Sequence, residues 1–274
     1  MTLTARWPLA LTVAAFLSTP VFSSTKDGLA LLDKGDVAGA AAAFQTAYDA
    51  GEGDGAFYLG RLFELGVGIK ADPMRAANLY AAGAEKGSIQ AMNRLGAMYL
   101  EGQVLLRDYA KSAELLCKAA AAGDADGQFN CGLAWQAGLG VEQDQAKAIS
   151  YWEQAAAQNH VAAMNFLGQA YQKGQGVEAD AAKALEFFQK TADQGNAMGL
   201  YELAKSYSEG DAPDLVKAYS FANLAAVRQH AEAASLRDTL EKKMDQKQIA
   251  AAQTLSRDWT EAHMQAQAAT PPTP

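Results

Sequence analysis

The 274-residue sequence has little of what enzymes and metal proteins usually need, with only two cysteines and three histidines, His160, His230 and His263. The histidines are far apart, and no Asp or Glu stands at a spacing from them that indicates a metal site. Nucleophile-elbow, Walker and zinc-binding motifs are also missing from the sequence. These absences leave no catalytic residue, metal or cofactor to predict, and they argue against an enzyme.

Basic clusters are missing as well. The formal charge is −8, and it becomes −9 without residues 1–23, which contain Arg6 as their only charged residue. Affinity for phosphates depends on clustered Lys and Arg, whereas the basic residues here are dispersed. We therefore expect no nucleic-acid partner and no affinity for anionic lipid surfaces.

The first residues lack an apolar run long enough to remain in a membrane. Trp7–Leu17 spans about 11 apolar residues, against roughly 20 for a permanent transmembrane helix. With Arg6 before it and Val21 and Ser23 at the −3 and −1 positions, the segment predicts a secretory signal peptide, residues 1–23, cleaved after Ser23. The alternative is an uncleaved anchor. We expect an exported, most simply periplasmic, protein without stable membrane insertion after cleavage.

Proline is scarce, at 7 residues, and the 24 glycines recur at regular intervals among many alanines. This mixture favours short helices joined by tight turns. The regularity has a period of 36 residues, shared by five repeats. Its packing columns are Leu59-Gly60, Leu95-Gly96, Cys131-Gly132, Leu167-Gly168 and Leu203-Ala204; the aromatic column Phe63, Tyr99, Trp135, Tyr171 and Tyr207; and the glycines 66, 102, 138, 174 and 210.

The residue type at each repeated position indicates a structural role. The glycine three residues after the aromatic is expected to end the first helix in the left-handed conformation. The aspartate column, Asp72, Asp108, Asp144 and Asp180, with Asp214 after a loop two residues shorter, is expected to cap the second helix. Asn159 replaces the glycine that closes the second helix elsewhere. Antiparallel helix pairs that stack on one another should result.

These motifs resemble the Sel-one-like repeat (SLR), a relative of the tetratricopeptide repeat. The unit from Leu167-Gly168 through Tyr171, Gly174, Gly176-Val177, Asp180 and Lys183-Ala184 to Gly195 matches that pattern closely, and Gln103–Leu106 departs from it. The resemblance implies an all-α, right-handed α-solenoid superhelix of tandem helix-turn-helix repeats over residues 24–235. Capping helices over 236–267 and a disordered tail over 268–274 would follow, and residues 29–50 would form an N-terminal cap repeat.

Cys117 and Cys131 lie at equal distances from the turn at Gly123-Asp124. Two interpretations stay open: a disulfide that joins adjacent repeats in an oxidising compartment, or two buried small apolar residues, since Cys131 fills a column otherwise held mainly by leucine.

Two columns on the first helices vary while the packing columns stay fixed. We call Phe57, Asn93, Phe129, Asn165 and Tyr201 the upstream column, and Arg61, Ala97, Leu133, Gln169 and Lys205 the downstream column. First helices usually line the concave surface of a solenoid, so we predict a partner-binding groove there. The predicted site residues are Phe57, Arg61, Asn93, Phe129, Asn165, Gln169, Tyr201 and Lys205. The alternative is that these side chains only pack between repeats or face solvent.

The sequence thus predicts an exported scaffold that mediates protein–protein interaction, as an envelope adaptor or regulator. The family resemblance also implies an alternative, a β-lactam-binding or β-lactam-hydrolysing enzyme of its cysteine-rich branch, which a single cysteine pair disfavours. The partner's identity and the oligomeric state are left undetermined.

Overall fold

A computed structural model describes residues 24–209 and 212–269 of the chain. The predicted signal peptide, Gly210 and the last five residues of the predicted tail lie outside the described residues. Within them, every regular element is a helix: the structure has fourteen α-helices and no strand. The all-α solenoid class predicted from the repeats is confirmed.

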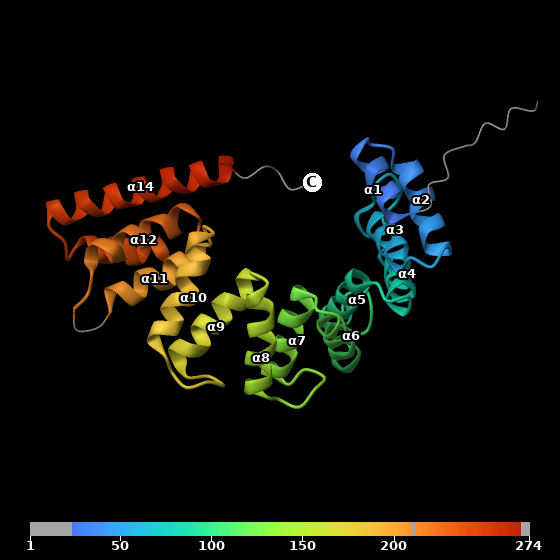
Figure 1. Cartoon of the computed structure of the whole chain (residues 1–274), viewed down its shortest axis with the longest axis horizontal. Coiled ribbons are helices and arrows are strands. Elements are labelled where there is room, and N and C mark those ends of the chain that lie inside the picture. The colour runs from blue at the N-terminus through green and yellow to red at the C-terminus, as the bar shows by residue number, and fades with distance from the viewer. Residues whose placement is uncertain (1–23, 210–211, 270–274) are drawn as a thin grey trace, which may run out of the picture. The chain divides into compact units, whose positions relative to one another are not determined.

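The chain divides into two compact units between Lys86 and Gly87. In each unit the helices pack against their neighbours in sequence, as antiparallel pairs (Figure 1). The first unit contains α1 (Thr25–Asp33), α2 (Val37–Asp49), α3 (Gly53–Leu65) and α4 (Pro73–Glu85). The second contains α5 (Ile89–Glu101), α6 (Tyr109–Ala121), α7 (Ala125–Ala137), α8 (Gln145–Ala157), α9 (Val161–Lys173), α10 (Ala181–Asp193), α11 (Ala197–Ser208), α12 (Leu215–Val227), α13 (Ala233–Glu241) and α14 (Gln246–Ala269).

The aspartate column caps the second helix of every repeat, as predicted. Each carboxylate accepts a hydrogen bond from the backbone N–H three residues on, for example Asp108 from Lys111 at 3.0 Å. The backbone N–H of the same aspartate donates to the backbone carbonyl of the aromatic-column residue in that repeat, for example from Asp108 to Tyr99 at 3.1 Å. One aspartate therefore starts the second helix and also ties it to the end of the first.

The turns adopt the left-handed backbone conformation at the described positions where the sequence predicts it. Gly66, Gly102, Gly138 and Gly174 end their helices with φ between 66° and 68°. Asn159 takes φ 62° and so replaces glycine, which confirms its predicted role. A residue with a Cβ would resist this conformation, and asparagine resists it least.

Two further columns hold the helix pairs together. A Cβ on Gly132 would overlap the indole of Trp152, and Gly60 and Gly168 face Tyr80 and Phe188 in the same way. The repeated basic residue of the second helix lies over the aromatic column, as with Lys147 Nζ at 4.0 Å from the Trp135 ring centroid. The same stacking recurs for Arg75 on Phe63, Lys111 on Tyr99, Lys183 on Tyr171 and Lys217 on Tyr207.

The C-terminal helices depart from the repeat. Both α13 and α14 pack against α12. Leu240 of α13 and Ala252 of α14 join a buried cluster with Tyr219 and Ala222 of α12. The end of the stack is thus covered by side chains from outside the repeat frame.

Candidate protein-binding surface

The upstream column occupies one position in five helices, the fifth residue of α3, α5, α7, α9 and α11. Four of its members are half-buried, and Asn165 is buried at 6% exposure. In the second unit, three members contact the N-cap residue of the next first helix, 31 positions later, and Tyr201 contacts His230, which lies shortly before α13. The column is therefore built into the joints between repeats.

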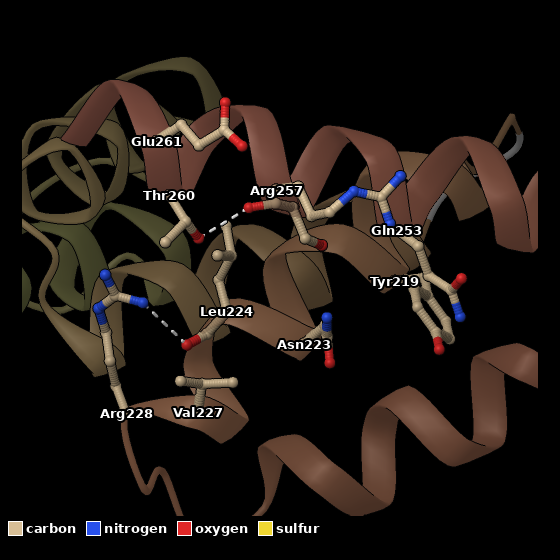
Figure 2. A pocket seen from close by; sticks show the side chains of 10 residues that line it. Tyr219, Asn223, Leu224, Val227, Arg228, Gln253, Arg257, Thr260 and Glu261 are labelled. Atoms are coloured by element: carbon tan, nitrogen blue, oxygen red, sulfur yellow. Dashed lines mark hydrogen bonds between the residues drawn. The ribbon is translucent and has the colours of Figure 1, made fainter. Parts of the chain in front are cut away.

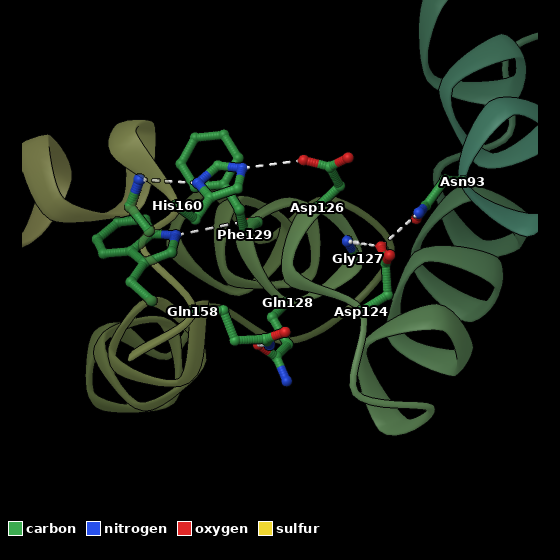
Figure 3. Close-up of polar contacts among 10 residues, drawn as sticks. Asn93, Asp124, Asp126, Gly127, Gln128, Phe129, Gln158 and His160 are labelled. Carbon is green, nitrogen blue, oxygen red and sulfur yellow. Dashed lines mark hydrogen bonds and ion pairs between the residues drawn. The ribbon is translucent and has the colours of Figure 1, made fainter. Parts of the chain in front are cut away.

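The two asparagines of this column hold the caps of the following helices. Asn93 Nδ2 donates to Asp124 Oδ2 at 2.6 Å, and Asn165 Nδ2 donates to Asn196 Oδ1 at 3.0 Å. Asp124 caps α7 and Asn196 caps α11. Because both cap oxygens act as acceptors, the asparagine NH₂ groups must point toward them. Each amide joins two repeats through one polar contact, and Figure 3 shows the contact of Asn93 with Asp124.

Phe129 makes the corresponding joint with an aromatic contact. Its ring stacks on His160 at 4.8 Å and meets Phe166 edge-on at 5.4 Å. His160 caps α9, since its Nδ1 accepts from the Ala163 N–H at 3.1 Å. This fixes the imidazole proton on Nε2, which lies 3.1 Å from Asp126 Oδ1 (Figure 3).

Tyr201 repeats this arrangement near the C-terminal end. Its ring stacks on His230 with centroids 4.1 Å apart, and Lys205 Nζ lies 5.7 Å from the same ring. Lys205 pairs with the buried carboxylate of Glu202 at 3.0 Å. Burial by itself would lower the pKa of Lys205, but the hydrogen bond and charge of Glu202 outweigh it and raise that pKa.

Phe57 and Arg61 lie in the first unit. Phe57 contacts the rings of Tyr58 and Tyr80. Arg61 Nη1 pairs with Glu64 Oε2 at 2.8 Å, and the same oxygen accepts from the Tyr80 hydroxyl at 2.6 Å. Burial, together with this bond, raises the pKa of Tyr80. Arg61 is thus engaged within its own helix pair.

Gln169 has the weakest internal contact of the predicted site residues. Its Nε2 lies 4.0 Å from the sulfur of Met198, which is 37% exposed. The side chain is half-buried and belongs to the downstream column. It has donor and acceptor capacity to offer a partner.

The sequence interpretation missed the partners of the upstream column. Asp124, His160 and Asn196 stand 36 residues apart, so a further column was visible at the start of each first helix. The residue types of the two columns change together. The pairs are an amide with a carboxylate (Asn93 and Asp124), a phenyl ring with an imidazole (Phe129 and His160), and two amides (Asn165 and Asn196). Such matched variation between two columns 31 residues apart was the available signal.

The two cysteines form a disulfide in the structure. Cys117 of α6 and Cys131 of α7 have Cα atoms 4.9 Å apart and are joined through their sulfurs. Of the two interpretations left open by the sequence, the disulfide is therefore the one found, and Cys131 is also fully buried. The bond connects the second helix of one repeat to the first helix of the next.

Residues 24–209 and 212–269 contain no group of three His, Cys, Asp or Glu side chains arranged to hold a metal ion. In the same part of the chain, no helix combines the length and apolarity that crossing a membrane demands.

Comparison with known proteins gives a consistent result. The structure is similar to the protective antigen c5321 of uropathogenic Escherichia coli strains, described as displaying an SLR fold, with a TM-score of 0.77 and 26% identity. That match covers 91% of this chain and 57% of the antigen, so the chain spans little more than half of its length. A Sel1 repeat protein from Oxalobacter formigenes matches with a TM-score of 0.71 and 26% identity, over 89% of this chain and all of the other. A search of curated protein sequences found no match.

The family comparison matches the repeat frame itself. The Sel1 repeat model fits residues 53–88, 89–124, 125–160, 161–196 and 197–226. Each match contains one first helix and one second helix of the structure. Proteins built from this repeat are typically scaffolds that bind other proteins. The matches cover more than half of the sequence, and the chain belongs to the Sel1 repeat family.

Proposed function

We propose that this protein is exported to the periplasm and works there as an envelope adaptor or regulator, holding a protein partner on the face that the upstream and downstream columns form within the second unit. The observation that carries the proposal is that the half-exposed aromatic rings of this face are already fixed by internal contacts. Phe129 is held by His160 and Phe166, and Tyr201 by His230. Rings fixed before binding lose little conformational freedom when a partner covers them.

The polar side chains between these rings would add selectivity. Gln169 and Lys205 lie on the downstream column, one turn from Asn165 and Tyr201. Aromatic anchors surrounded by amide and basic groups are the composition typical of protein-binding hot spots. This supports a peptide or protein ligand over a small apolar one.

Export is supported by the sequence of residues 1–23 and agrees with the disulfide, because such bonds persist mainly in oxidising compartments. Expression of the full chain in a bacterial host, followed by N-terminal sequencing of the periplasmic fraction, tests this part. The expected product begins at Ser24. A chain retained in the cytoplasm with residues 1–23 intact would contradict export.

The binding face is tested by affinity capture from an envelope extract with residues 24–274. One variant carries Phe129→Leu, Tyr201→Leu and Gln169→Ala, which shorten the binding side chains while keeping apolar bulk at the joints. The control carries Met74→Ala and Leu106→Ala, since these side chains are 50% and 91% exposed outside the two columns. Circular dichroism and thermal unfolding establish that both remain folded.

We expect the wild type and the control to retain the same partner, and the three-site variant to lose most of it. The direct interaction is then measured with the purified partner, where a loss of about tenfold corresponds to 1.4 kcal/mol. Equal affinity of all three proteins would reject this face as the binding site.

A further inference from the structure

A groove of the second unit lies between α12, the second helix of the fifth repeat, and α14, which lies outside the repeat frame. It has a volume of about 680 Å³, within the range of roughly 300–1,000 Å³ found for ligand sites. Leu224 and Tyr219 form its apolar floor, with exposures of 3% and 4%, while Val227 stands at its edge with 73% exposure (Figure 2). The groove is therefore apolar at its centre and open to a ligand.

Arg228, the C-cap residue of α12, places a guanidinium group at one end of this groove. One of its nitrogens donates to the Leu224 carbonyl at 3.3 Å, and the group lies 4.8 Å from the Trp259 ring centroid. Among the described residues, no carboxylate forms an ion pair with it. Burial lowers the pKa of Arg228, the direction expected for a cation without an anionic partner.

Arg257 of α14 supplies a second guanidinium toward the other end of the groove (Figure 2). Its Nη2 donates to Thr254 Oγ1 at 2.9 Å, and it too has no ion pair within the described part of the chain. Of the other described arginines, Arg61, Arg94 and Arg237 form ion pairs, while Arg75 and Arg107 lie over the rings of Phe63 and Tyr109. Two unpaired arginines at one groove are notable in a chain with a charge of −8.

Two neighbouring groups bear on the ligand's chemistry. Glu261 also lines the groove, but it pairs with neither arginine, and its carboxylate points away from α12 (Figure 2). Gln253 lines the α14 side, and its amide makes no hydrogen bond to the described residues. An amide of this kind can pair with a peptide backbone, which offers one donor and one acceptor per residue.

We propose that the groove between α12 and α14 binds a peptide segment of a protein partner in which an apolar side chain lies between two acidic ones. The carboxylates pair with Arg228 and Arg257, the apolar side chain covers Leu224 and Val227, and Gln253 bonds the peptide backbone. Guanidinium–carboxylate pairs of this kind are strong and directional. This site shares no residue with the upstream or downstream column, so it can be tested independently of the binding face proposed above.

The test uses residues 24–274 and two blocked, fluorescently labelled peptides that contain the sequences Glu-Leu-Glu and Glu-Leu-Ala-Glu. Matched peptides carry glutamine in place of glutamate. Binding is measured by fluorescence anisotropy at low and high salt. The protein variants are Arg228→Gln and Arg257→Gln, and Arg107→Gln is the control because it removes the same charge from the exposed loop before α6, which does not line the groove.

We expect at least one acidic peptide to bind, and each groove variant to weaken it by about tenfold while the control changes it less than about twofold. Salt should weaken binding, since the attraction is between charges. The side-chain Nε–Hε NMR signals of Arg228 and Arg257 should shift on titration, and that of Arg107 should not.

Equal binding of the glutamine peptides, full affinity in the Arg228→Gln/Arg257→Gln double variant, or no binding at millimolar peptide would each overturn the proposal. The variant with Phe129→Leu, Tyr201→Leu and Gln169→Ala should bind the acidic peptides like the wild type. Failure of envelope capture together with intact peptide binding would therefore reject only the column face, and the reverse result would reject only the groove.

Discussion

At the scale of single residues, the N-cap positions of α7, α9 and α11 differ in chemistry while keeping one role. Asp124, His160 and Asn196 all accept a backbone hydrogen bond as N-caps. Each also contacts the upstream-column residue of the preceding repeat. A cap can therefore vary only together with the side chain that rests on it, and this links sequence variation in adjacent repeats.

His160 allows the two roles to be separated. His160→Ala removes the cap and the stacking on Phe129, and we expect a loss of about 1–3 kcal/mol in the free energy of unfolding. His160→Asn restores a capping oxygen, as Asn196 provides naturally, and should recover about 1 kcal/mol. Urea unfolding of the three proteins measures both. If the asparagine variant were no more stable than the alanine variant, the cap would contribute nothing.

Asp144 predicts how one cap depends on pH. The backbone hydrogen bond from Lys147 lowers the pKa of its carboxyl group. A lowered folded-state pKa means that the stabilisation is complete above the unfolded-state pKa and is lost as the pH falls through the folded-state value, between about pH 5 and pH 2. Asp144→Asn keeps a capping oxygen that does not titrate, so its stability should fall less steeply over this range.

The measurement is the urea midpoint at intervals from neutral pH down to about pH 2, so that it covers the whole range in which the cap should titrate. Glu142→Gln removes the same charge from the exposed loop before α8 and serves as the matched control. Parallel curves for the wild type and Asp144→Asn would show that the cap does not titrate as inferred.

At the scale of elements, close approach of the two helices in a pair depends on the glycine of the first helix. Gly132 of α7 leaves space for the buried indole of Trp152 of α8, whose Nε1 donates to the Phe129 carbonyl at 3.2 Å. Added bulk here must push the indole or the helix aside. The same contact positions the backbone of Phe129, so packing within a pair also supports the candidate binding face.

We expect Gly132→Ala to destabilise the protein by about 1–3 kcal/mol through overpacking. In the fifth repeat, whose loop is two residues shorter, Ala204 and the small Ala222 occupy the equivalent positions, so the smaller side chain of Trp152→Leu should partly relieve the alanine substitution. In a double-mutant cycle the combined loss should be smaller than the sum of the single losses by more than about 0.5 kcal/mol. Simple additivity would mean that Gly132 and Trp152 do not limit each other.

At the scale of the whole molecule, the described helices contact mainly their neighbours in sequence, so a change in one repeat should have local effects. The Cys117–Cys131 disulfide joins α6 to α7 across a separation of 14 residues. Replacing both cysteines with alanine should lower the stability of the second unit by about 3 kcal/mol, as estimated for a loop of this length.

Hydrogen exchange read by mass spectrometry locates that effect. Protection should decrease in α6 and α7, and it should stay unchanged in α1 to α4, which belong to the other compact unit. Reduction of the wild type with dithiothreitol should reproduce the pattern. A uniform decrease in every helix would contradict nearest-neighbour stability.

The fold could be predicted from the sequence because the same turn and cap residues recur in five repeats. Each turn needs a residue that tolerates the left-handed backbone, and each second helix needs a capping acceptor, so Gly138, Asn159 and Asp144 indicate their roles locally. These are properties of one residue and its near neighbours. The repeat frame, the helix pairs and the family resemblance follow from them.

What only the tertiary structure decided concerns contacts between residues far apart in sequence. The sequence presented Phe129 and Asn165 as variable surface positions, but their use as joints appears only when His160 and Asn196 come within reach. The groove that contains Arg228 and Arg257 likewise depends on α14 returning to pack on α12, which no repeat pattern specifies. The sequence of each repeat determines the local backbone conformation, whereas a binding site depends on which side chains the packing leaves unpaired.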